Sequence, residues 1–190
     1  MKGGLPLTDF FDAVSSGNYP YYSITNRYVI GPAVELGLPF GLGVELDALY
    51  RHFSYETPGF RTTTPPIIQL HDGLEDVTGG AWEIPLLAQY RFRTPVVKPY
   101  VDAGIAWDVL SGVSGTVCSI NCGTTSDPRS LQRSTVKGFV AGAGLDVHLL
   151  FLHIAPEIRY TRWGSEHFVS PIGGLSSNQN QAEFLLGILF

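Results

Sequence analysis

QAEFLLGILF, residues 181–190, alternates between two kinds of side chain along its length. Every second residue from Phe190 back to Ala182 is apolar, whereas the residues between them become polar toward Glu183 and Gln181. Successive side chains of a β-strand point to opposite faces of a sheet, so this alternation predicts a strand with two different faces.

The same alternation recurs upstream, and it predicts seven strands together with the last segment, plus an eighth in KGGLPLTDFF near the start. Long polar connections alternate along the chain with short links. This pattern is typical of an up-and-down barrel with long loops at one end and short turns at the other. We therefore expect an all-β fold, an eight-stranded antiparallel barrel that forms one domain over residues 1–190. The upstream segments are 25–39, 43–51, 81–92, 99–109, 136–148 and 151–163, and the long connections are 12–24, 56–79, 111–134 and 164–179.

The composition favours a β-rich protein and argues against nucleic-acid binding and against a membrane-spanning helix. The chain is 44% hydrophobic and only 15% charged, with 22 Gly and 13 Pro, which favours strands and turns. A net charge of −5 with scattered basic residues argues against a nucleic-acid partner. No apolar run approaches the ~18 residues of a membrane helix, but a membrane-spanning strand needs only ~9–11 alternating residues. No signal peptide follows Met1, and we expect that it has been removed.

The two strand faces differ in charge, and this predicts which one faces inward. The apolar face carries no charge over the seven clear strands except Arg162 at a strand end, whereas the other face carries many Asp, Glu and Arg residues. Lys, which dominates water-facing surfaces, occurs only at positions 2, 98 and 137. The mixed charges therefore predict a polar lumen, either a salt-bridged plug or a polar pathway for ions. The candidate lumen cluster is Glu45, Asp47, Glu83, Arg91, Asp102, Glu157, Arg159 and Glu183.

Aromatic residues of the apolar face fall into two bands when the strands run alternately up and down. Such bands flank an aliphatic waist at the two interfaces of a membrane barrel. The candidate aromatic girdle is Tyr28, Tyr50, Trp82, Trp107 and Tyr160 toward the long loops, and Phe190 toward the short turns. Pro32, Pro85 and Pro156 lie inside predicted strands, where each removes a ladder donor, so bulges or local breaks are expected there.

Few motifs point to chemistry. Cys118 and Cys122 lie in a long loop, and in an oxidising compartment we expect them to form a disulfide that stiffens the loop tip. Residues 165–167 read Ser-Glu-His, but adjacent residues do not face one another and cannot form a triad among themselves. We expect no catalytic residue, no metal site and no cofactor.

Five segments, including GPAVELGLPFGLGVELDALY (31–50), PYVDAGIAW (99–107) and NQAEFLLGILF (180–190), match a known kind of protein. On these segments the chain resembles the small eight-stranded bacterial outer-membrane barrels of the OmpA/OmpX kind. The resemblance implies residence in the outer membrane of a Gram-negative bacterium, as a monomer, with the lipid bilayer and the assembly machinery that reads the C-terminal strand as partners. It implies a scaffold whose four outer loops contact extracellular partners. A narrow channel for ions or small solutes, a lipid-modifying rim enzyme and a soluble ligand-binding barrel remain as alternatives. The segments that carry the resemblance are 31–50, 99–107, 139–147, 156–163 and 180–190.

Overall fold

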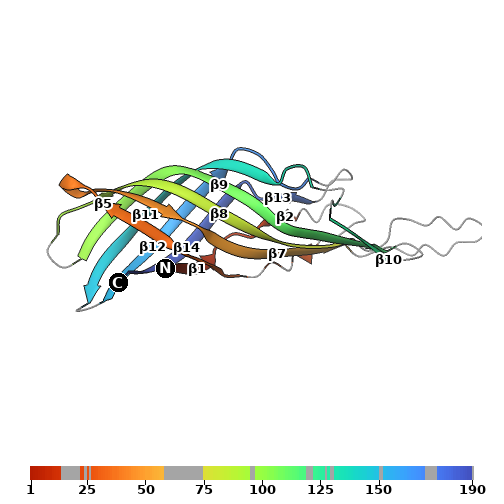
Figure 1. Ribbon diagram of the computed structural model, residues 1–190, viewed down its shortest axis with the longest axis horizontal. Coiled ribbons are helices and arrows are strands. Elements are labelled where there is room, and N and C mark those ends of the chain that lie inside the picture. Colours follow the sequence, from red (N-terminus) through yellow and green to blue (C-terminus); the bar gives the residue numbers. More distant parts are fainter. Residues whose placement is uncertain are drawn as a thin grey trace, which may run out of the picture.

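The strands close into an eight-stranded antiparallel barrel, which confirms the predicted fold class (Figure 1). Two of its eight walls are each divided between two strands. The computed structural model describes residues 1–13, 22–23, 25, 27–57, 75–94, 97–118, 122–126, 128, 131–149, 152–169 and 175–189. The walls, in chain order, are β1 (Lys2–Pro6), β4 (Val29–Gly31) with β5 (Ala33–Gly37), β6 (Leu42–Asp47) with β7 (Leu49–Thr57), β8 (Glu75–Arg91), β9 (Val97–Cys118), β11 (Thr135–Leu149), β12 (Leu152–Trp163) and β14 (Asn180–Leu189).

Closure of the barrel joins the first wall to the last. β1 pairs antiparallel with β14 over its full length, from Lys2 opposite Gly187 to Pro6 opposite Glu183. The amino group of Met1 also donates a hydrogen bond to the carbonyl oxygen of Ile188 at 2.9 Å. The two ends of the chain therefore lie close together on one side of the barrel (Figure 1).

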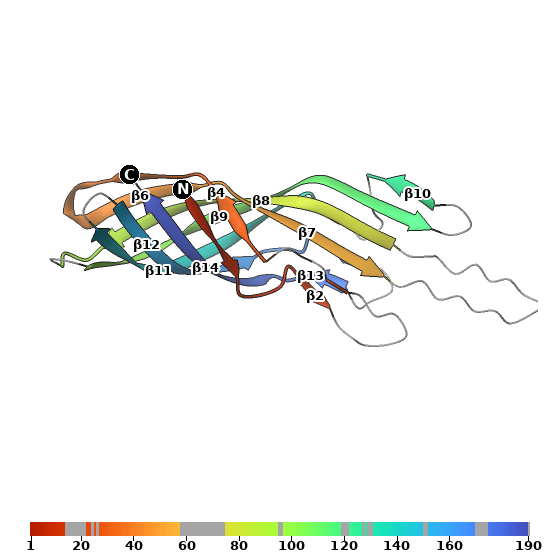
Figure 2. The same cartoon turned by 90° about the horizontal axis from the view of Figure 1, so that it is seen from below.

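The two ends of the barrel differ. Short links, among them the 3₁₀ turn η1 (Pro39–Gly41), join the walls at one end, which we call the turn end. At the other, the loop end, β7, β8 and β9 continue past the closed barrel as a ribbon (Figure 2). β3 (Tyr22–Ser23) pairs with β7 and β10 (Cys122–Thr125) pairs with β9. A separate pair, β2 (Phe11–Ala13) with β13 (Leu175–Ser177), also lies at the loop end.

The ladder is interrupted beside each proline, as the sequence predicts. Pro32 separates β4 from β5, and its carbonyl accepts a hydrogen bond from the amide of Ala48, the residue that separates β6 from β7. Pro85 lies within β8 where the ladder passes from β6 to β7. Pro156 lies opposite residues 145–146 of β11, where the pairing of β11 with β12 is missing. Each proline thus lies where the ladder has a gap, so its missing backbone N–H leaves no ladder hydrogen bond unmade on that side.

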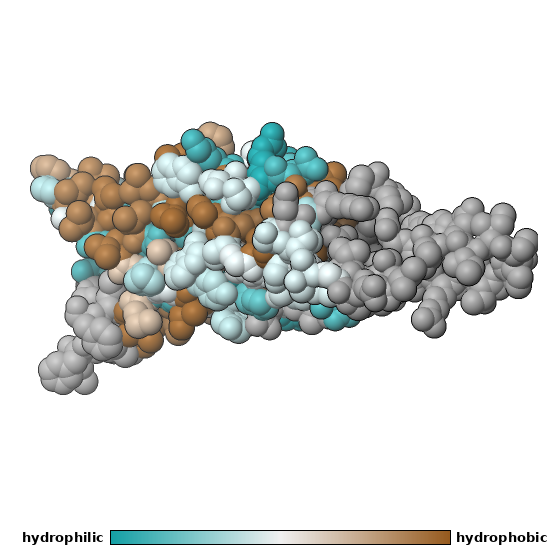
Figure 3. All heavy atoms as spheres, turned by 45° about the vertical axis from the view of Figure 1, so that its right-hand side comes forward, coloured by the Kyte–Doolittle hydropathy of each residue, from teal (hydrophilic) through white to brown (hydrophobic). Residues whose placement is uncertain are grey.

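The barrel is apolar outside and charged inside. Leu36, Leu46 and Ile158 are 65%, 48% and 60% exposed on the outer face. Figure 3 shows brown apolar surface around the turn-end half, which gives way to hydrophilic surface toward the loop end. A contiguous apolar exterior of this kind marks contact with another apolar phase. Within the described residues, no helix has the length and hydropathy needed to cross a membrane.

Candidate functional site

The interior of the barrel is the candidate functional site. Strand periodicity sends every second side chain of each wall inward, and the polar residues follow that parity. The structure places all the predicted lumen residues inside. Seven of them are at most 4% exposed, and only Arg91, near the turn end, is more open, with its side chain 24% exposed. The seven are Glu45, Asp47, Glu83, Asp102, Glu157, Arg159 and Glu183.

Arg159 is the centre of a first group, the Arg159 layer, which also contains Lys2, Glu45, Asp47 and Glu157. Its guanidinium donates to Asp47 Oδ2 at 2.9 Å, to Glu45 Oε1 at 2.9 Å and to Glu157 Oε1 at 2.7 Å. The ammonium of Lys2 donates to Glu157 Oε2 at 2.6 Å and also to Glu45. Buried charges are tolerated when they are paired and hydrogen-bonded, and this layer meets that condition with side chains from three walls, β1, β6 and β12.

A second group lies nearer the loop end and is centred on Arg51; we call it the Arg51 layer. The guanidinium of Arg51 lies 3.2 Å from Asp108, 3.5 Å from Glu183 and 3.8 Å from Glu83. His167, in the segment after β12, adds its Nε2 at 3.3 Å from Asp108 Oδ2. This layer therefore ties a loop-end segment to the charged interior.

The third group lies at the turn end. Arg91 is paired with Glu35, and its Nε lies 3.6 Å from Asp146 Oδ2. Tyr100 lies between this Arg91 layer and the Arg159 layer: Arg91 lies over its ring at 5.9 Å, and its hydroxyl donates to Glu157 at 3.1 Å. The cavity that these side chains leave has a volume of about 10 Å³, roughly the volume needed for a single water.

Asp102 lies in the interior but outside the three layers. Neither carboxylate oxygen of Asp102 has a hydrogen-bond partner among the described residues. Gln89 lies directly opposite Asp102 in the ladder, and its side-chain amide also has no partner among them. Gly142 gives Asp102 its space, because a Cβ there would lie 2.6 Å from Oδ1. The structure thus places Asp102 beside the ion pairs without joining it to them.

Above the Arg51 layer the interior changes from charged to aromatic. The rings of Phe10 and Phe53 stack with centroids 4.8 Å apart, and Phe11 packs on Tyr55 at 5.0 Å. Phe168, from the segment after β12, lies 5.5 Å from Phe53. All five rings are buried, and we call this cluster the aromatic cap.

The aromatic cap meets the Arg51 layer at Phe10, whose ring also stacks with that of His167 at a centroid distance of 6.2 Å. The guanidinium of Arg51 lies 4.9 Å from the centre of the Phe10 ring, a cation–π distance. Proceeding from the turn end, the interior therefore contains the Arg91 layer, the Arg159 layer, the Arg51 layer and the aromatic cap.

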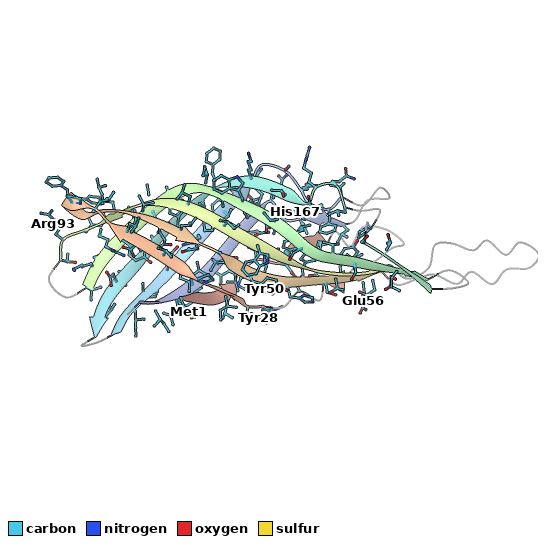
Figure 4. The ribbon with its side chains drawn as sticks, in the orientation of Figure 1. Met1, Tyr28, Tyr50, Glu56, Arg93 and His167 are labelled. Atoms are coloured by element: carbon cyan, nitrogen blue, oxygen red, sulfur yellow. The ribbon has the colours of Figure 1, made fainter. Side chains whose placement is uncertain are left out.

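The predicted girdle residues lie on the outer face. Tyr28, Trp82 and Tyr160 are exposed there, while Tyr50 and Trp107 are half-buried. The rings of Tyr50 and Trp82 are 5.1 Å apart on neighbouring walls, and Figure 4 shows Tyr28 and Tyr50 in the part of the barrel nearer the ribbon. The sixth girdle candidate, Phe190, lies outside the described residues.

The cysteines are described only in part. Cys118 ends β9 and Cys122 begins β10, and the backbone places them directly opposite each other in the ladder. Their side chains lie outside the described residues, so the predicted disulfide stays a prediction.

The hydrogen bonds of His167 do not form the Ser–His arrangement of a hydrolase. The ring of His167 is directed at Asp108 and at the backbone carbonyl of Arg133, which lies 2.8 Å from Nδ1. The hydroxyl of Ser177 accepts hydrogen bonds from the backbone amides of His167 and Phe168, not from the imidazole ring. Among the described residues, no group of three His, Cys, Asp or Glu side chains has the spacing of a metal site.

Sequence reasoning missed part of the site. It left Lys2, Arg51, Asp108 and Asp146 out of the lumen cluster, although their strand parity matches that of its members, and it treated His167 as a loop residue. It also missed the aromatic cap. A signal was present in residues 45–55, whose inward positions change from acidic through Arg51 to Phe53 and Tyr55.

Comparison with known proteins bears on the barrel as a whole. A family model described as an outer membrane protein beta-barrel domain matches residues 1–164. This range includes every wall from β1 to β12 and therefore most of the three charged layers. A search of curated proteins found no match.

Proposed function

The chain belongs to the outer membrane protein beta-barrel domain family, and from that premise we propose that this integral outer-membrane barrel has a plugged lumen and acts as a scaffold for interactions outside the membrane. The observation that carries the proposal is the continuous filling of the interior by three ion-pair layers and an aromatic cap. An eight-stranded barrel leaves a lumen that side chains can just fill.

The contacts favour a plug over a channel. A conducting pathway needs a continuous column of water, but the cavity beside Arg91 and Tyr100 holds only about 10 Å³. Arg159 and Lys2 each contact carboxylates from more than one wall, so their charges are held in fixed pairs instead of lining an open path. The aromatic cap adds an apolar barrier at the loop end.

The experiment for the plug is single-channel recording of the refolded protein in a planar lipid bilayer, with insertion verified by protease protection. We expect a silent membrane at applied voltages that open porins. Steady small openings of the parent protein would instead establish the narrow channel, and the inward charges would then act as selectivity residues.

The scaffold role rests on the ribbon of β7, β8, β9 and β10. β10 pairs with β9 on one side, and among the described strands none pairs with its other edge at Gly123 and Thr124. An open strand edge offers backbone donors and acceptors to an added strand, which is a general mode of peptide recognition. We therefore place the interaction surface at this edge.

This surface can be tested by panning a random peptide library against the barrel inserted in liposomes. Gly123 and Thr124 are successive residues of β10, so one amide points to β9 and the other to the open edge. Proline at the edge-facing position should abolish enrichment of strand-forming peptides. If strand-forming peptides are still enriched with the Gly123→Pro variant and also with the Thr124→Pro variant, β10 is not the binding edge.

A further inference from the structure

The turn end carries a concavity that the plugged interior does not use. It has a volume of about 460 Å³, within the range of ligand pockets and far larger than the 10 Å³ cavity inside the barrel. Its lining comes from the η1 turn, the end of β8, the start of β9 and the residues that follow β8. The lining residues are Gly41, Arg91, Phe92, Arg93, Thr94 and Lys98.

Three of the lining residues are cations, and none is an acid. Arg91 is engaged by Glu35 and Asp146, so its charge is largely balanced. The side chains of Arg93 and Lys98, by contrast, have no hydrogen bond or ion pair to any residue that the structure describes, although Lys98 lies opposite Asp146 in the ladder. Figure 4 shows Arg93 at the extreme turn end of the molecule, far from Glu56 in the ribbon. The three cations outnumber the two neighbouring acids, Glu35 and Asp146, so the concavity presents an excess of positive charge.

Exposed aromatic rings border this positive charge. Phe40 is 79% exposed, and Phe92, at 46% exposed, packs edge-on against Tyr90 with ring centroids 5.1 Å apart. Phe40 also has φ of 68°, in the left-handed region, which a non-glycine residue adopts only with backbone strain. Contact of the Phe40 ring with the apolar part of a membrane would offset the strain of the η1 turn.

Depth in the membrane can be read from β8. From Trp82 to Phe92 the chain advances ten residues, which matches the ~9–11 residues that a tilted strand needs to cross the hydrocarbon core. If Trp82 lies at one interface, Phe92 lies at the other. Arg93 and Lys98 then lie at the depth of the lipid headgroups.

We propose that this concavity binds the phosphate headgroup of an anionic membrane phospholipid. Arg93 and Lys98 supply the charge that pairs with the phosphate, and Phe40 and Phe92 pack against its glycerol and upper acyl region. A soluble anion would gain nothing from the exposed rings, which is why the occupant is a lipid. The proposal goes beyond the scaffold function, since it requires only that the barrel is inserted.

The test uses the full chain in mixed detergent micelles with phosphatidylglycerol and phosphatidylcholine, and native mass spectrometry counts the lipids retained. Each Lys or Arg near an anionic surface contributes about 1 kcal/mol, so Arg93→Gln with Lys98→Gln should lower the retention of phosphatidylglycerol ~30-fold. The matched control is Lys137→Gln with Arg162→Gln, two exposed cations toward the loop end. We expect the control to retain phosphatidylglycerol like the parent.

A second variant separates lipid binding from folding. Phe40→Gly removes the ring and relieves the backbone strain, because glycine adopts positive φ without penalty. It should fold at least as well as the parent and still bind the lipid less tightly. Equal retention by the Arg93/Lys98 variant and its control would overturn the proposal. So would full displacement of the lipid by inorganic phosphate, which would make the concavity a site for soluble anions.

Discussion

Arg159 donates a hydrogen bond from its guanidinium to Asp47 Oδ2 at 2.9 Å, although the two residues belong to opposite walls of the barrel. Arg159 lies on β12, the seventh wall, and Asp47 ends β6 in the third. Both side chains are buried, so the bond crosses the full width of the interior. The same guanidinium also holds Glu45 and Glu157. The proposed plug depends on this one side chain more than on any other.

Replacing Arg159 by leucine should therefore strongly destabilise the barrel. The change leaves buried carboxylates without their cation, which typically costs about 3–5 kcal/mol. Urea unfolding of the lipid-inserted protein, followed by tryptophan fluorescence, measures the loss. The control is Arg162→Leu on the same strand, whose exposed side chain bonds Asn180 and should cost about 1 kcal/mol or less. Equal losses for the two variants would contradict the central role of Arg159.

The barrel architecture could be predicted from the sequence because strand parity is a local property. The alternation over residues 181–190 and its repeats place each side chain on one face, and a membrane barrel leaves only one way to distribute the charges. Parity assigns Glu45, Glu157 and Arg159 to the inward face, and in the structure all three side chains are buried. It cannot say which of them touch, because contacts between opposite walls depend on the stagger of the whole barrel.

Only part of the aromatic cap could be predicted in the same way, because parity places Phe53 and Tyr55 inward but says nothing of Phe10 and Phe168. Phe10 and Phe168 lie at or beyond strand ends, where there is no periodicity to read, and both contact Phe53 from segments far away in the sequence. His167 presents the same difficulty, since its partner Asp108 lies far away in sequence. Tertiary closure at the loop end creates these contacts, and no local pattern encodes them.

Arginine at the middle of the lipid-facing surface should impair membrane insertion. Leu46 and Leu186 are exposed on the outer face of β6 and β14. An arginine at the bilayer midplane costs roughly 2–4 kcal/mol, and one near the interface costs about 0–1 kcal/mol. Leu46→Arg and Leu186→Arg should therefore fold poorly into liposomes, as measured by protease protection, while Ser111→Arg, exposed toward the loop end, should fold like the parent. Normal insertion of both leucine variants would reverse the inside–outside assignment.

The facing positions of Cys118 and Cys122 predict that the isolated protein contains a disulfide between them. Intact mass before and after reduction, with alkylation of free thiols, tests this directly. Closing so small a ring stabilises the hairpin by about 2 kcal/mol in the chain-entropy description. Reduction should therefore speed amide hydrogen exchange in β10, up to ~30-fold, and leave β11 unchanged. Alkylation of both cysteines without prior reduction would contradict the prediction.

The aromatic cap should contribute stability that an exposed phenylalanine does not. Phe53 is fully buried and contacts Phe10, Phe11 and Phe168, so Phe53→Ala removes a ring from a packed interior. Such a truncation typically costs about 3–5 kcal/mol. Phe139 is 75% exposed on the outer face, where it contacts lipid, so Phe139→Ala loses this contact but opens no cavity and should cost less than Phe53→Ala.

The comparison is made by urea unfolding in the same liposomes, so both variants share one reference state. Bilayer recordings of Phe53→Ala add a second measurement, because the charged layers beneath the cap remain intact. We expect the variant to be less stable and still silent, since the Arg159 and Arg51 layers block the interior without the cap. Openings in Phe53→Ala, with a silent parent, would show that the aromatic cap is the barrier and that the ion pairs beneath it conduct.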